Sequence, residues 1–126
     1  MPIFDPNRVR DIANNDGEFA VAARLWDCAI RIKVGASPYR LVVANGRVDS
    51  FAREAGGANA DIEIAGPQDE WEEAMKPVPR PFLHDLFGAQ WREHFTVEGD
   101  MLTYCAYYPA LRRLFEIMRA SAQHKG

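Results

Sequence analysis

Alternation between apolar and charged residues predicts most of a β-sheet in this chain. Four segments in its first half show the two-residue period of half-buried strands: residues 29–34 (AIRIKV), 39–44 (YRLVVA), 47–52 (RVDSFA) and 60–66 (ADIEIAG). The dipeptide Asn45-Gly46 between the second and third segments favours a two-residue hairpin turn. We expect these four strands to follow one another as a meander, and residues 94–99 (HFTVEG) to add a fifth strand.

Helical signals occupy the N-terminus. Asp5 is suited to be an N-cap because Pro6 follows it, and proline is favoured at the first position of a helix. Residues 18–25 predict a second short helix, since Phe19 and Trp26 bracket apolar residues at helical spacing. The break between the two helices is the polar segment 14–17 (NNDG).

Three more helices are predicted in the second half of the chain. Pro67 begins an acidic helix whose apolar side carries Trp71, Ala74 and Met75. The proline-rich segment 76–81 (KPVPRP) cannot be regular structure. A short insert helix is expected over residues 81–88, closed by Gly88, and a long C-terminal helix over residues 100–119. Pro109 interrupts the last helix and is expected to kink it.

Composition places the chain among single globular domains. Its 126 residues are 48% hydrophobic and 26% charged, so we expect one domain over residues 1–126. The net charge is −3 and no basic cluster stands out, so a nucleic-acid partner is not expected. The N-terminus does not resemble a signal peptide and no apolar run is long enough for a membrane span, which favours a cytoplasmic protein. Cys28 and Cys105 form no CxxC motif, and we expect free thiols, no metal and no cofactor.

Three stretches carry a resemblance to a known family: residues 39–51 (YRLVVANGRVDSF), 60–71 (ADIEIAGPQDEW) and 95–118 (FTVEGDMLTYCAYYPALRRLFEIM). In their order and spacing they resemble the sterol carrier protein type-two family, in its small bacterial stand-alone form. The resemblance covers about residues 29–118. It implies an α+β fold, in which helices pack on one face of a five-stranded, mostly antiparallel sheet. It also implies an apolar cavity between sheet and helices that binds lipids, sterols or acyl chains.

One region departs from the family pattern. The family usually has a short loop after the acidic helix, whereas this chain has the longer, proline-stiffened segment 76–94 (KPVPRPFLHDLFGAQWREH), which carries two histidines. We therefore expect the wall of the ligand site to come from the insert helix and the C-terminal helix.

The candidate ligand-binding residues are the apolar and aromatic side chains of these two helices: Phe82, Leu83, Leu86, Phe87, Trp91, Met101, Tyr104, Cys105, Tyr108, Leu111 and Phe115. A ligand cavity and an ordinary hydrophobic core use the same residue types, so core packing is the competing interpretation for each of them. Tyr104 and Tyr108 share a helix face and could offer two hydroxyls to a polar group on an apolar ligand.

Binding of a hydrophobic small molecule is the leading functional hypothesis, and two alternatives stay open. The first is a cofactor-independent enzyme on the same scaffold, in which His84, Asp85, His94 or Tyr104 would act as acid and base. The second is an interaction module that forms a homodimer. Surface or structural roles for the two histidines compete with the enzyme hypothesis.

Overall fold

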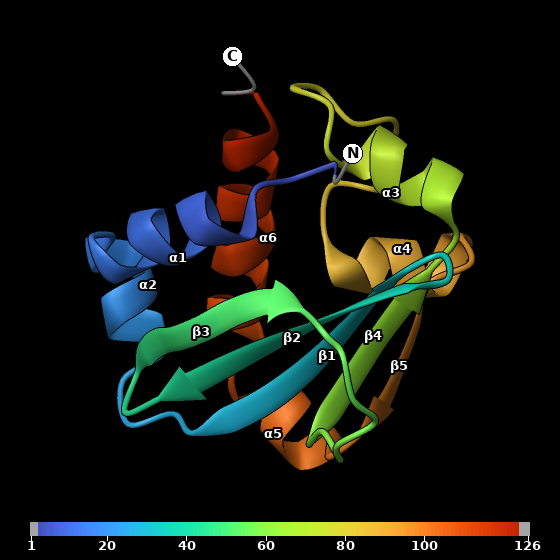
Figure 1. The fold of residues 1–126 in the computed structure, drawn as a ribbon. Coiled ribbons are helices and arrows are strands. Elements are labelled where there is room, and N and C mark those ends of the chain that lie inside the picture. The colour runs from blue at the N-terminus through green and yellow to red at the C-terminus, as the bar shows by residue number, and fades with distance from the viewer. Residues whose placement is uncertain (1–2, 124–126) are drawn as a thin grey trace.

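A five-stranded sheet in the order β3-β2-β1-β4-β5 forms the base of the molecule (Figure 1). The computed structural model describes residues 3–123. The strands are β1 (Cys28–Val34), β2 (Ser37–Ala44), β3 (Arg47–Arg53), β4 (Ile62–Gly66) and β5 (Thr96–Gly99). All five lie where strands are predicted from the sequence. The hairpin between β2 and β3 turns at Asn45 and Gly46, whose φ angles of 51° and 76° are the left-handed values that such turns require.

The connection from β3 to β4 corrects the predicted meander. The first three strands pair with their chain neighbours in antiparallel fashion, but β4 lies beside β1 and runs parallel to it, with Ile30 opposite Ile62. β5 then pairs with β4 in antiparallel orientation. The sheet is therefore mixed, although mostly antiparallel. Alternation fixes which face a side chain occupies but not which strand is its neighbour, so the crossover was not visible in the sequence.

Charged side chains hold the crossover segment against the exposed face of the sheet. The Arg31 guanidinium donates to Glu54 at 2.6 Å and to the carbonyl of Ala58. Arg40, on the neighbouring strand, donates to Glu54 at 3.4 Å and to the carbonyl of Asn59 at 3.0 Å. These contacts explain why arginines alternate with the buried apolar residues of β1 and β2.

Six helices complete the described part of the chain: α1 (Pro6–Asn14), α2 (Gly17–Ala22), α3 (Gln68–Ala74), α4 (Leu86–Arg92), α5 (Met101–Ala106) and α6 (Tyr108–Ala122). Asp5 caps α1, with Pro6 in its first turn, as predicted. None of the helices within residues 3–123 is long and apolar enough to cross a membrane.

Two predicted helices differ in the structure. The insert helix is α4, which begins at Leu86 rather than at residue 81 and contains Gly88 instead of ending there. The predicted helix 100–119 is two helices, because the chain breaks at Tyr107 and restarts with Pro109 in the first turn of α6. Proline is acceptable in a first turn, where no backbone N–H is needed, so a break replaces the expected kink.

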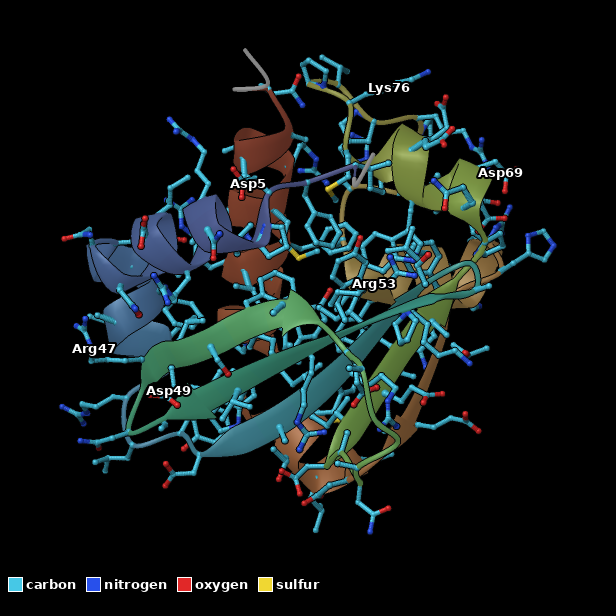
Figure 2. The ribbon with its side chains drawn as sticks, in the orientation of Figure 1. Asp5, Arg47, Asp49, Arg53, Asp69 and Lys76 are labelled. Atoms are coloured by element: carbon cyan, nitrogen blue, oxygen red, sulfur yellow. The ribbon has the colours of Figure 1, made fainter. Side chains whose placement is uncertain are left out.

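The core lies between the sheet and the helices, where side chains fill the space that separates the ribbons (Figure 2). Trp71 of α3 is 1% exposed, and its indole N–H donates to the carbonyl of Lys33 at 3.0 Å. Its ring contacts Phe95 and Phe115, with centroids 4.9 and 5.7 Å away. Burial of each large apolar side chain contributes roughly 1.5–3 kcal/mol, so this side of the sheet supplies most of the stability.

Candidate functional site: an apolar pocket beside α4

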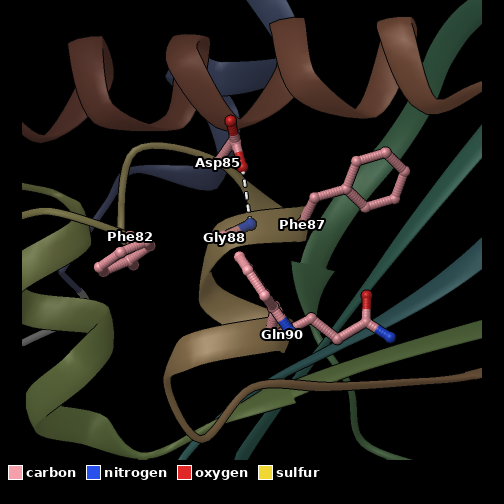
Figure 3. Close-up of a pocket in the computed structure, with 6 residues that line it drawn as sticks. Phe82, Asp85, Phe87, Gly88 and Gln90 are labelled. Atoms are coloured by element: carbon pink, nitrogen blue, oxygen red, sulfur yellow. Dashed lines mark hydrogen bonds between the residues drawn. The ribbon is translucent and has the colours of Figure 1, made fainter.

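A pocket of about 720 Å³ opens at the surface beside α4 (Figure 3). It is lined by Phe82, Asp85, Phe87, Gly88, Gln90 and Trp91. The three aromatic side chains stay substantially exposed, at 43% for Phe82, 48% for Phe87 and 77% for Trp91. A single exposed apolar residue needs no explanation, but three around one hollow mark a candidate binding surface.

The first turn of α4 is held by two side-chain acceptors. The Asp85 carboxylate accepts the N–H of Gly88 at 2.9 Å and is the N-cap of the helix (Figure 3). The hydroxyl of Tyr108, which comes from α6, accepts the N–H of Phe87 at 3.1 Å. Both acceptors satisfy backbone donors that a helix start leaves without partners. The wall of the pocket is thereby fixed to α6.

Phe82 has a strained backbone at the edge of this pocket. Its φ of 72° lies in the left-handed region, which costs a non-glycine residue about 1–2 kcal/mol. The backbone of Phe82 also lies against Gly88, where an added Cβ would be 3.0 Å from the Phe82 carbonyl oxygen and 3.2 Å from its Cα. Glycine at position 88 therefore permits the close approach of the Phe82 backbone to α4.

Two tyrosines pack on Phe87, which is one of the residues that line the pocket. Phe87 stacks on Tyr108 with ring centroids 3.5 Å apart, and Tyr104 meets both rings edge-on at 5.7 Å. The hydroxyl of Tyr104 donates to the side-chain oxygen of Gln90 at 3.2 Å. Burial raises the pKa of Tyr104 and of Tyr108. Both phenols are therefore neutral groups that act through hydrogen bonds.

Arg92 adds a positive charge to the aromatic rim. Its guanidinium carbon lies 4.8 Å from the centre of the Phe82 ring and 5.4 Å from the centre of the Trp91 ring. Cation–π attraction at an exposed site contributes about 0.5–1 kcal/mol. The rim of the pocket is therefore apolar with one cation, and its polar atoms belong to Gln90 and Asp85.

The structure separates the predicted ligand-binding residues into three groups. Phe82, Phe87 and Trp91 line the pocket, and Tyr104 and Tyr108 pack against the Phe87 ring. Met101 and Cys105 are exposed on α5. The remaining candidates are buried among core side chains: Leu83, Leu86, Leu111 and Phe115. The observed pocket opens at the surface, and an internal cavity between sheet and helices stays a prediction.

The predicted acid–base residues do not converge on one reacting position. His94 has an exposed ring, whose Nδ1 contacts the Glu70 carboxylate, and its backbone N–H donates to the same carboxylate at 2.9 Å. The Glu70 carboxylate raises the pKa of His94. His84 is exposed, and its carbonyl accepts from Arg119 at 2.8 Å. Asp85 caps α4 and Tyr104 meets Gln90. This arrangement gives the enzyme hypothesis no support.

Sequence reasoning missed Arg92, Gln90 and the role of Gly88. Asp85 follows a proline-rich loop and lies three residues before Gly88, and this spacing could have indicated the start of a helix. An N-cap aspartate commonly accepts the backbone N–H three residues later. The contact of Arg92 with Phe82 had no local signal, because the loop conformation brings the two residues together.

The fold is that of sterol carrier protein 2. A crystal structure of sterol carrier protein 2 aligns with a TM-score of 0.74 and 16% identity, over 95% of this chain and 99% of that one. The solution structure of a conserved hypothetical protein from Thermus thermophilus, described as a candidate sterol carrier protein, aligns with a TM-score of 0.72 and 17% identity, over 100% and 94%. The UbiJ-SCP2 ubiquinone synthesis protein aligns with a TM-score of 0.59 and 18% identity, over 88% and 87%.

The similarity to these three proteins lies in the fold and not in the sequence. No protein-family model and no curated protein matches the sequence. At 16–18% identity the comparison establishes the α+β fold that the residues predict, while function has to be argued from the pocket itself.

Proposed function

We propose that this protein binds a hydrophobic small molecule, such as a lipid, a sterol, an acyl chain or an aromatic compound, at the α4 pocket. The observation that carries the proposal is the pocket wall, where Phe82, Phe87 and Trp91 surround about 720 Å³ without being buried. Ligand sites are mostly apolar, with a few polar groups that orient the ligand. Gln90 and Asp85 are the polar groups of this wall.

We further propose that the apolar part of the ligand points inward, toward the interior predicted to hold a cavity. Phe87 and Tyr108 stack on each other, and they come from the helices that carry the buried Leu86 and Leu111. A shift of the stacked Phe87 and Tyr108 rings would open a path from the pocket to these leucines. The residues predicted as ligand-binding would then act together, with the buried leucines contacting the ligand after entry. A cytoplasmic setting and a homodimeric state remain predictions beside this proposal.

The test is to extract the purified protein with organic solvent and to identify any bound hydrophobic molecule by mass spectrometry. Titration with a fluorescent fatty-acid analogue then measures affinity in the emptied protein. Phe87→Ala is expected to weaken probe binding by about tenfold or more, because it removes one of the three aromatic rings that line the pocket. Val21→Ala on α2 is the matched control, since Val21 is also apolar and is 79% exposed. An empty extract together with equal probe affinity in all three proteins would refute the proposal.

A further inference from the structure

Beyond the pocket's contents, its rim has the composition of a surface that meets a lipid bilayer. We name Phe82, Phe87, Trp91 and Arg92 the α4 rim. Trp91 is the most exposed of its aromatic residues at 77%, and the Arg92 guanidinium lies over two of the three rings. Tryptophan and arginine side chains combine an apolar body with a polar end, and both are favoured where headgroups meet acyl chains.

The charge of the α4 rim is locally positive. Neither Arg92 nor Arg112 forms a salt bridge with any residue of the described segment 3–123. Arg112 follows Tyr108 by one helical turn and is close enough to affect the pKa of that tyrosine. Glu93 pairs with Arg80, and the Asp85 carboxylate caps α4 through a neutral backbone N–H, so Arg92 and Arg112 together exceed it by one positive charge. The chain as a whole has a net charge of −3, so this excess is local.

Backbone strain points to the same surface. Phe82 adopts a left-handed φ of 72° and still leaves its ring 43% exposed. Residues held in sparsely populated backbone conformations cluster at active sites and ligand-binding positions. Strain, aromatic exposure and unpaired positive charge therefore occur together at one edge of the molecule.

We infer that the α4 rim docks on an anionic lipid bilayer, with Trp91 at the interface and Arg92 and Arg112 facing lipid phosphates. A second copy of the chain fits the rim less well. A two-fold interface formed by the rim would place two surfaces with the same positive excess against each other. In the docked orientation the pocket opens toward the bilayer, so that a ligand, where the proposed function holds, would move between bilayer and pocket without crossing water.

The tryptophans make the inference directly measurable. Trp26 and Trp71 are each 1% exposed, whereas Trp91 is 77% exposed. Trp91 will therefore dominate any change in tryptophan emission at the protein surface. Vesicles of phosphatidylcholine and phosphatidylglycerol in a 3:1 ratio are expected to co-sediment with the protein and to shift its emission to shorter wavelength. Trp91→Phe should lose the shift but keep most of the sedimentation.

Variants separate the apolar from the electrostatic contribution. Trp91→Ala should weaken sedimentation by about tenfold, because its indole no longer enters the interface. Arg92→Gln and Arg112→Gln should each weaken it by roughly fivefold at low salt, and less at high salt. Val21→Ala on α2 and Arg24→Gln are the matched controls, since both positions are exposed and lie outside the α4 rim.

Four outcomes would overturn the inference. The protein could fail to sediment with the vesicles, or it could bind pure phosphatidylcholine vesicles equally well. The two control variants could lose as much vesicle binding as the rim variants. Light scattering could show a dimer whose formation moves the Trp91 emission to shorter wavelength. Vesicle binding needs no bound ligand. An empty solvent extract together with unchanged probe affinity would therefore count against the proposed function alone, while failure to bind vesicles would count against the docking surface alone.

Discussion

Two aromatic clusters of similar composition behave in opposite ways in this molecule. The core cluster comprises Phe4, Tyr39, Phe51, Trp71, Phe95 and Phe115, and none of its members is more than 7% exposed. The α4 rim also has a tryptophan and phenylalanines, yet these are 43–77% exposed. Both sets are built on a tryptophan and phenylalanines, and the difference lies in what each ring packs against.

The core cluster has the sheet beneath it. Phe51 and Tyr39 come from adjacent strands, and Trp71 and Phe115 from helices that cover them. The α4 rim instead lies on a seven-residue helix and a proline-rich loop, outside the buried face of that helix, which carries Leu86 and Ala89. The comparison indicates that the core cluster provides stability, and that the α4 rim is available to a partner.

The largest expected effect is a loss of stability when a tryptophan of the core cluster is replaced, and it tests whether the two clusters differ in role. Trp71→Ala should lower the free energy of unfolding by about 3–5 kcal/mol, because it leaves a cavity in the core and leaves the Lys33 carbonyl without the indole donor. Trp91→Ala is the matched control and should change stability by less than about 0.5 kcal/mol. Urea unfolding followed by circular dichroism measures both. Similar losses for the two variants would show that the clusters do not differ in role.

The two clusters also differ in how well their structure could be predicted from the sequence. The core cluster was largely predictable, since Tyr39 and Phe51 occupy alternating strand positions and Trp71 lies on the apolar side of an acidic helix. Local spacing specifies such faces well. The parallel pairing of β4 with β1 was not predictable, because it depends on a chain crossover that leaves no local periodicity.

The aromatic residues that line the candidate site were predictable, but Gln90, Gly88 and the arrangement of the site were not. Phe82, Phe87 and Trp91 were candidates from the sequence, and the structure places them around one pocket. Asp85 was predicted as an acid–base candidate, whereas its carboxylate caps α4. The left-handed φ of Phe82 could not be foreseen, since that conformation is rare for an aromatic residue and is imposed by its surroundings. Tertiary contacts therefore decided the site's shape.

A smaller effect tests whether the α4 rim is strained as the backbone indicates. Phe82→Gly should be more stable than Phe82→Ala by about 1 kcal/mol, because glycine adopts a positive φ without a steric penalty. At Phe87, within α4, the order should reverse, since glycine costs about 0.5–1 kcal/mol relative to alanine in a helix. Chemical denaturation of the four variants gives both differences. If the glycine variant were less stable than the alanine variant at both positions, the backbone of Phe82 would not be strained.

The smallest effect concerns the boundary of the core cluster, where Glu70 and His94 precede Trp71 and Phe95 in the chain and pair with each other. The Glu70 carboxylate raises the pKa of His94 in the folded protein. A raised folded pKa stabilises the fold at pH values below the unfolded pKa of about 6.5. This contribution is lost as the pH rises through the higher folded value.

His94→Gln should therefore destabilise the protein more at pH 5.5 than at pH 9, as measured by thermal unfolding across that range. Glu70→Gln keeps the shape of the buried side chain and removes its charge, so adding His94→Gln to Glu70→Gln should abolish the pH-dependent difference. The α4 rim has no part in this pair, and vesicle binding by His94→Gln should match that of the unaltered protein. If the stability difference grew toward pH 9, or if vesicle binding changed with it, core cluster and α4 rim would be coupled rather than separate.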